Sequence, residues 1–133
     1  MIGRTRSIVT LAEVLERYLA EWSECTGIAV EIWALPSTGV PSRVSSCVMA
    51  AMREALSNVE RHSRAKTVSI AVTSGEGGVR LTVSDNGQGF PRPASGRGIA
   101  RMRMAFAEAG GSLSVNSVLG EGTTVTGVVP RRS

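Results

Sequence analysis

The stretch from Thr67 to Asp85, TVSIAVTSGEGGVRLTVSD, limits most strongly how this chain can fold. Apolar and polar residues alternate on both sides of a glycine-rich turn, and the apolar ones are Val68, Ile70, Val72, Val79, Leu81 and Val83. An alternation of period two predicts two β-strands that share an apolar face and form a hairpin. Because such a face must be buried by another layer, we expect an antiparallel sheet covered on one side.

Segments with helical periodicity can supply that covering layer. Apolar residues recur every three or four positions in residues 8–25, 42–63 and 99–109, which predicts three amphipathic helices. Thr10 or Ser7 is expected to cap the first helix, and Gly27 suits its end.

The remaining segments complete a two-layer arrangement. Residues 28–33 (IAVEIW) are typical of a short strand, and residues 112–130 form a second hairpin with its turn at 119–122. The order α-β-α-ββ-α-ββ predicts an α+β sandwich, with a largely antiparallel sheet and helices on one face.

Length and composition set broad limits. The 133 residues fit a single domain over 1–133, in which residues 1–7 are expected to be a disordered or vector-derived start. The net charge of +4 permits binding to phosphates, nucleic acid or acidic proteins without choosing among them. Cys25 and Cys47 lack metal-ligand spacing, so we expect two reduced, buried thiols in a cytoplasmic domain. No apolar run approaches the roughly 18 residues of a membrane span.

A polar column runs along the second predicted helix. Glu54, Asn58 and His62 are spaced at i, i+4 and i+8, and each step turns only about 40° around the helix. The column borders the apolar stripe, where a helix faces either solvent or a cleft. Asparagine is a poor helix former, so its place in mid-helix hints at another duty.

Glycine-rich motifs follow at three points. SDNGQGF (84–90) places Asp85 at a strand end, where it can accept a hydrogen bond, and its glycines allow a ligand close to the backbone. SGRGIARMR (95–103) places two glycines before a helix, an arrangement that exposes amides to an anion. GEGTTV (120–125) is a turn entering a strand. Taken singly, each motif is also compatible with an ordinary turn.

The order of these motifs resembles the GHKL ATPase superfamily, which groups gyrase-type topoisomerases, Hsp90-type chaperones, histidine kinases and mismatch-repair ATPases. Within it, REALSNVERHSRA, DNGQGF, a very short lid and GGSLSV…GEGTTV are most similar to the catalytic, ATP-binding domain of bacterial sensor histidine kinases of the NarL/DesK-like class. The resemblance implies the Bergerat ATP-binding fold.

The resemblance also implies roles for individual residues in the helix motif. Asn58 would ligate the Mg²⁺ that bridges the nucleotide phosphates. Glu54 would orient a metal-bound water or act as a base. His62 or Arg61 would lie near the phosphates.

Further roles follow for the glycine motifs. Asp85 would accept a hydrogen bond from the adenine amine, and Thr123 would support it. Arg101 stands where the class usually has glycine, and would narrow the lid or add a phosphate contact. Gly87 and Gly89 would allow the nucleotide to approach the backbone closely. Gly96 and Gly98 would form the hinge of the lid and the start of the following helix.

The lone histidine bears on the reaction. His62 is the only histidine, and the resemblance assigns it to the helix motif. A histidine kinase of this kind would therefore pass the γ-phosphate of ATP to a histidine on a separate dimerisation domain, and through it to a response regulator. The isolated chain is expected to be monomeric, to autophosphorylate little and to contact neither nucleic acid nor a membrane, although its parent protein could be membrane-anchored. The alternatives are a stand-alone anti-sigma-type serine kinase and a binding module without kinase activity.

Overall fold

The computed structural model describes residues 10–37, 39–87 and 97–131. Its elements are α1 (Leu11–Thr26), β1 (Ala29–Ala34), α2 (Ser42–Asn58), the π-helical turn η1 (Val59–Ser63), β2 (Thr67–Gly75), β3 (Gly78–Asp85), α3 (Arg97–Glu108), β4 (Ser112–Val118) and β5 (Gly122–Val129). This order confirms the predicted succession of helices and strands. The second helical segment is divided, because its last turn is wound as a π-helix.

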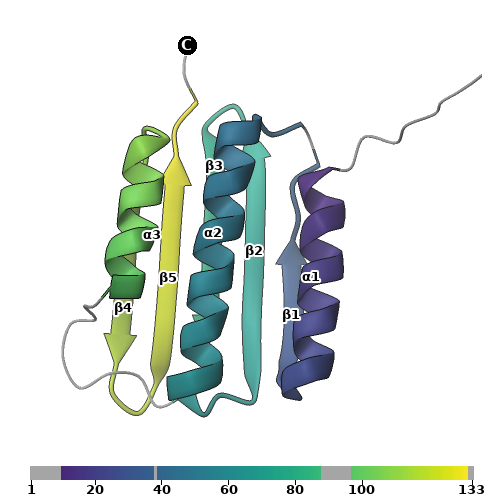
Figure 1. Cartoon of the computed structure of the whole chain (residues 1–133), viewed down its shortest axis with the longest axis vertical. Coiled ribbons are helices and arrows are strands. Elements are labelled where there is room, and N and C mark those ends of the chain that lie inside the picture. The colour runs from purple at the N-terminus through teal and green to yellow at the C-terminus, as the bar shows by residue number, and fades with distance from the viewer. Residues whose placement is uncertain (1–9, 38, 88–96, 132–133) are drawn as a thin grey trace, which may run out of the picture.

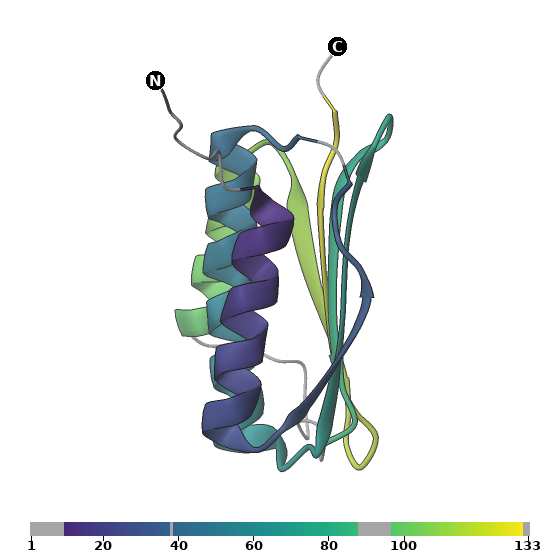
Figure 2. The same cartoon turned by 90° about the vertical axis from the view of Figure 1, so that its right-hand side faces the viewer.

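The five strands form one sheet in the order β1-β2-β3-β5-β4. β1 pairs with β2 in parallel, and the other three pairings are antiparallel. All three α-helices lie against one face of this sheet (Figures 1 and 2). The predicted two-layer α+β sandwich with a largely antiparallel sheet is therefore confirmed.

Local signals explain where α1 begins and ends. The Thr10 hydroxyl accepts a hydrogen bond from the backbone N–H of Glu13, and the Glu13 carboxylate accepts one from the backbone N–H of Thr10. This reciprocal pair satisfies two amides that the first helical turn leaves free. At the other end Gly27 adopts a left-handed φ of 78°, a conformation that costs glycine little.

The core lies between the helices and the sheet. The strand residues of the predicted hairpin face are buried, as are the apolar stripes of α2 and α3. The largest fully buried side chains include Phe106, Leu15, Leu19, Met52 and Leu56. The apolar faces of the helices and of the strands therefore pack against each other in one core, as the pattern predicted.

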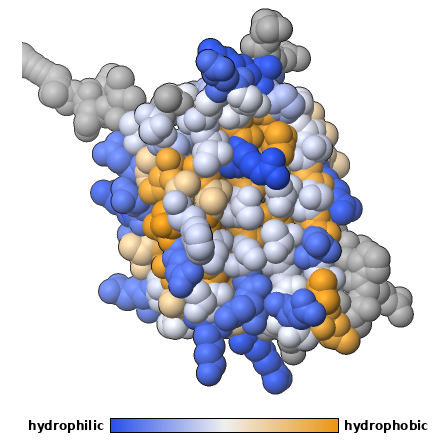
Figure 3. Space-filling view, turned by 180° about the vertical axis from the view of Figure 1, so that it is seen from behind, coloured by the Kyte–Doolittle hydropathy of each residue, from blue (hydrophilic) through white to orange (hydrophobic). Residues whose placement is uncertain are grey.

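The sheet face turned away from the helices is seen in Figure 3, with pale side chains of intermediate hydropathy across its middle. Partly exposed residues there include Thr82, Ser84, Thr124 and Thr126. Among the described helices, none is both long and apolar enough to cross a membrane.

One expectation about the cysteines is wrong. Cys47 is buried, but Cys25 is exposed. At about 100° per residue, Cys25 lies about 80° around α1 from the buried Leu15 and about 20° from the exposed Val14, at the edge of the apolar stripe. Its thiol therefore faces solvent.

Candidate functional site

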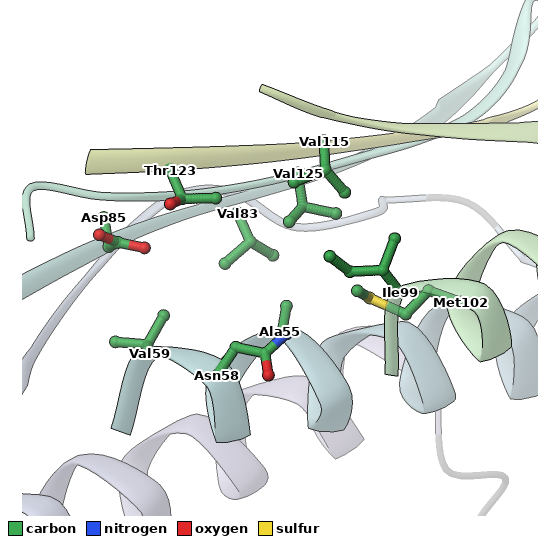
Figure 4. Close-up of a pocket in the computed structure, with 10 residues that line it drawn as sticks. All are labelled: Ala55, Asn58, Val59, Val83, Asp85, Ile99, Met102, Val115, Thr123 and Val125. Carbon is green, nitrogen blue, oxygen red and sulfur yellow. The ribbon is translucent and has the colours of Figure 1, made fainter. Parts of the chain in front are cut away.

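A pocket forms where the end of α2 and the start of α3 meet β3, β4 and β5. Its lining consists of Ala55, Asn58, Val59, Val83, Asp85, Ile99, Met102, Val115, Thr123 and Val125. The strand residues line one wall and the helix residues the other (Figure 4). Three of the predicted site residues, Asn58, Asp85 and Thr123, come from different motifs and meet here.

Asp85 is the buried acid of this pocket. It ends β3 with only 9% of its surface exposed. Its Oδ1 accepts a hydrogen bond of 2.8 Å from the backbone N–H of Gly87, and the carboxylate also accepts one from the backbone N–H of Thr123. Burial raises the pKa of Asp85, and these two hydrogen bonds oppose that rise. A carboxylate offers about four acceptor positions, so capacity remains for a donor in the pocket.

Gly122 allows β5 to start directly beside Asp85. It has a φ of 120°, and a Cβ added to it would lie 2.1 Å from the carbonyl oxygen of Asp85. The next residue, Thr123, is the register partner of Asp85 in the β3–β5 ladder. The Thr123 hydroxyl also shares a hydrogen bond of 2.9 Å with the hydroxyl of Ser117. The last glycine motif thus shapes the base of the pocket.

Asn58 ends α2 and is half-buried in the pocket lining. The π-helical turn η1 follows at once and closes with Arg64 in a left-handed conformation, φ 58°. Such turns often occur at functional sites. The described residues contain no group of three or more His, Cys, Asp or Glu that could hold a metal ion. The amide oxygen of Asn58 is a type of ligand that hard cations accept.

Glu54 lies one helical turn before Asn58 and contacts the start of α3. Its Oε1 accepts a 3.0 Å hydrogen bond from Nη2 of Arg101. A Cβ added to Gly98 would lie 2.3 Å from Oε2 of Glu54. The absence of a side chain at Gly98 therefore leaves space for this carboxylate beneath α3.

One further predicted residue lies outside the pocket lining, and three others cannot be placed from the described residues. The exposed Arg61 donates from its Nε to the carbonyl oxygen of Ser57, at 3.4 Å, and is not among the lining residues. Gly89, Gly96 and the side chain of His62 lie outside the described part of the chain.

Sequence reasoning did not identify the apolar walls of the pocket as part of the site. Val83, Ile99 and Met102 were expected only on the apolar faces of their strand and helix, and Val125 was not singled out. These wall residues lie close in sequence to the motif residues, at the same ends of the strands and helices, and this proximity could have indicated that they line the site. The cavity of this pocket is about 20 Å³, which is room for about one water molecule.

A wider hollow of about 1030 Å³ lies at the opposite end of α2. It is lined by the start of α2, the β2–β3 turn and the end of α3, together with Arg43, Glu76 and Arg131. None of the predicted site residues lines it, so the smaller pocket is the candidate site.

The fold also occurs in solved histidine kinases. The histidine kinase domain of the blue-light activated histidine kinase of Erythrobacter litoralis superposes with a TM-score of 0.72 at 23% identity, over 96% of this chain and 65% of that one. The ATP binding domain of PrrB from Mycobacterium tuberculosis gives 0.67 at 22% identity, over 94% of this chain and 96% of that one.

Sequence relatives agree with this fold. The sensor histidine kinase LiaS of Bacillus subtilis is 36% identical over 123 residues, which cover 90% of this chain and 34% of LiaS. The nitrate/nitrite sensor protein NarX of Escherichia coli is 39% identical over 85 residues, or 63% of this chain and 14% of NarX. This chain therefore spans about a third or less of these relatives.

The family comparison covers every residue that lines the pocket. Residues 44–133 match the model of the family described as histidine kinase-, DNA gyrase B- and HSP90-like ATPase. That stretch contains all of α2 but its first two residues, together with η1, α3 and strands β2 to β5, and all the lining residues come from these elements. The chain therefore belongs to the family of histidine kinase-, DNA gyrase B- and HSP90-like ATPases.

Proposed function

We propose that this chain binds ATP with Mg²⁺ and donates the γ-phosphate to a histidine on a separate dimerisation domain of its parent protein, in two-component signalling. The observation that carries the proposal is the meeting of Asn58, Asp85 and Thr123 in one pocket. Membership of the ATPase family and the sensor histidine kinase relatives support it.

In this proposal Asp85 reads the base. Its buried carboxylate accepts a hydrogen bond from the exocyclic amine of adenine, and Val83 and Ile99 contact the faces of the ring. Guanine has a carbonyl oxygen at the corresponding position, which Asp85 would repel. Because a mismatched polar group would be left buried and unpaired, we expect a preference for ATP over GTP.

The phosphates would lie toward the end of α2. The amide oxygen of Asn58 is a suitable ligand for a hard cation, and Glu54 would orient a water on that cation or accept a proton. Bound Mg²⁺ supplies neutralisation of the charge on the transferring phosphoryl group. The start of α3 at Gly98 would present backbone amides to the phosphates.

The phosphoacceptor would lie outside this chain. His62 is the only histidine, and its backbone belongs to η1, directly after Asn58. A histidine beside the proposed metal ligand would serve the nucleotide site. The acceptor and the response regulator beyond it would therefore be partners on other segments.

Calorimetric titration with ATP, with and without Mg²⁺, tests the nucleotide and metal parts of the proposal. Wild-type chain should bind ATP more tightly with Mg²⁺, and Asn58→Ala should abolish that gain while leaving metal-free binding. Asn116→Ala, on the exposed side of β4, is the matched control. Absence of ATP binding at millimolar concentration would refute the proposal.

The phosphoryl transfer is tested separately. Chain mixed with γ-labelled ATP and the histidine-bearing domain of the parent protein should place acid-labile phosphate on that domain. Label that is acid-stable and on serine would instead identify a serine kinase.

A further inference from the structure

Arg101 lies on α3 between the pocket-lining residues Ile99 and Met102, and the proposed reaction assigns it no task. It stands on the first turns of α3, and its guanidinium spans to Oε1 of Glu54 on α2 at 3.0 Å. The Arg101 side chain is 64% exposed, whereas that of Glu54 is only 18% exposed. The largely buried carboxylate of Glu54 is thus paired with the guanidinium of a side chain that is mostly exposed to solvent.

The confined carboxylate creates an electrostatic problem for a phosphate ligand. Glu54 and Asn58 are four residues apart on one helix, so their Cβ atoms are about 6 Å apart. A triphosphate held near Asn58 would lie within about one Debye length, roughly 8 Å, of the Glu54 charge at physiological salt. Without compensation, that charge would repel the phosphates but not the base, which would lie toward Asp85.

We infer that Arg101 is a positioning residue that compensates the charge of Glu54 and thereby raises affinity for the polyphosphate part of the nucleotide. This inference rests on the proposed function and extends it to the discrimination between ATP, ADP and adenosine. The pair also joins the start of α3 to α2 beside Gly98, where the added-Cβ distance of 2.3 Å to Glu54 indicates close packing. Arg101 therefore acts through Glu54, without requiring its own contact with ATP.

Titrations of the whole chain with ATP, ADP and adenosine test the inference, and they are done without Mg²⁺ so that the proposed role of Glu54 at the cation does not enter. Arg101→Gln should weaken ATP binding about two- to five-fold, as expected for a largely exposed charge, weaken ADP binding less, and leave adenosine binding unchanged. The double variant Glu54→Gln/Arg101→Gln removes both charges and should return the ratio of ATP to adenosine affinity toward the wild-type value. Raising the salt concentration should shrink the effect of Arg101→Gln.

Arg103→Gln is the matched control. Arg103 is exposed on the same helix, about 200° around from Arg101, so its loss removes an equal charge away from Glu54. Its ratio of ATP to adenosine affinity should stay closer to the wild-type value than that of Arg101→Gln. Circular dichroism of each variant verifies folding.

The outcomes separate the inference from the proposed function. If wild-type chain binds adenosine and ATP but Arg101→Gln has the wild-type affinity ratio, the inference is wrong and the proposed function stands. The inference is equally wrong if the double variant binds ATP as weakly, relative to adenosine, as Arg101→Gln alone. If wild-type chain binds neither ligand, the proposed function fails and the inference falls with it.

Discussion

Replacing Gly122 with alanine should disturb the pocket through the backbone of Asp85. The new Cβ would lie 2.1 Å from the Asp85 carbonyl oxygen and 3.0 Å from its carbonyl carbon. Both atoms belong to the rigid end of β3, so β5 and β3 must separate locally by about 1 Å to restore an ordinary contact. Gly122 also has a φ of 120°, which alanine adopts only with strain.

The magnitude follows from two contributions. The strained φ costs about 1–3 kcal/mol. Separation of the strands also weakens the hydrogen bond from the Thr123 N–H to Asp85, worth about 1–2 kcal/mol. We expect Gly122→Ala to lower the free energy of unfolding by about 2–5 kcal/mol and to weaken ATP binding, because the displaced Asp85 no longer meets the base.

Gly120→Ala provides the matched comparison. Gly120 has a φ of 85°, and nothing lies within 4 Å of its added Cβ. Its cost should be limited to backbone strain of about 1 kcal/mol, with unchanged ATP affinity. Urea unfolding followed by circular dichroism gives the stabilities, and calorimetry gives the affinities. Equal losses of stability and affinity in both variants would refute the reasoning.

Further expectations concern pH, the thiols and phosphorylation. Because burial raises the pKa of folded Asp85 above 3.8, the contribution of Asp85 to stability is largest below that value and declines as pH rises through the raised pKa. ATP affinity should fall on acidification, as Asp85 becomes protonated. Calorimetric titrations of Asp85→Asn should lack this pH-dependent step. Iodoacetamide should alkylate Cys25 in the folded chain and spare Cys47, which is buried and has a thiol pKa raised to about 11; mass spectrometry showing equal labelling would contradict this. Isolated chain incubated with γ-labelled ATP should incorporate little label, and strong labelling of His62 would contradict an external acceptor.

The fold could be predicted because its signals are local and mutually consistent. The alternation around Ile70 and Leu81 specifies strands, and the stripe through Met52 and Leu56 specifies a helix that can cover them. The meeting of Asn58 and Asp85 also follows from such signals, once the strand order places the end of β3 near the end of α2. Thr123 joins them because it pairs with Asp85 across the ladder.

Other parts of the site depend on contacts that local patterns do not encode. The ion pair between Arg101 and Glu54 requires the docking of α3 on α2, which is set by tertiary packing. The π-helical turn after Asn58 leaves no clear periodic mark. The exposure of Cys25 depends on where α1 rests on its neighbours. Side-chain roles that arise between elements are therefore the hardest to read from sequence.

The most direct test of the nucleotide pocket compares ATP and GTP binding by wild-type chain and by Asp85→Asn. Wild-type chain should prefer ATP. Asp85→Asn should fold normally and lose about ten-fold or more in ATP affinity, since a hydrogen bond to a charged group contributes about 1.5–3 kcal/mol. Equal ATP affinity of the two proteins, or equal binding of ATP and GTP by wild-type chain, would contradict the assignment of Asp85 as the residue that reads the base.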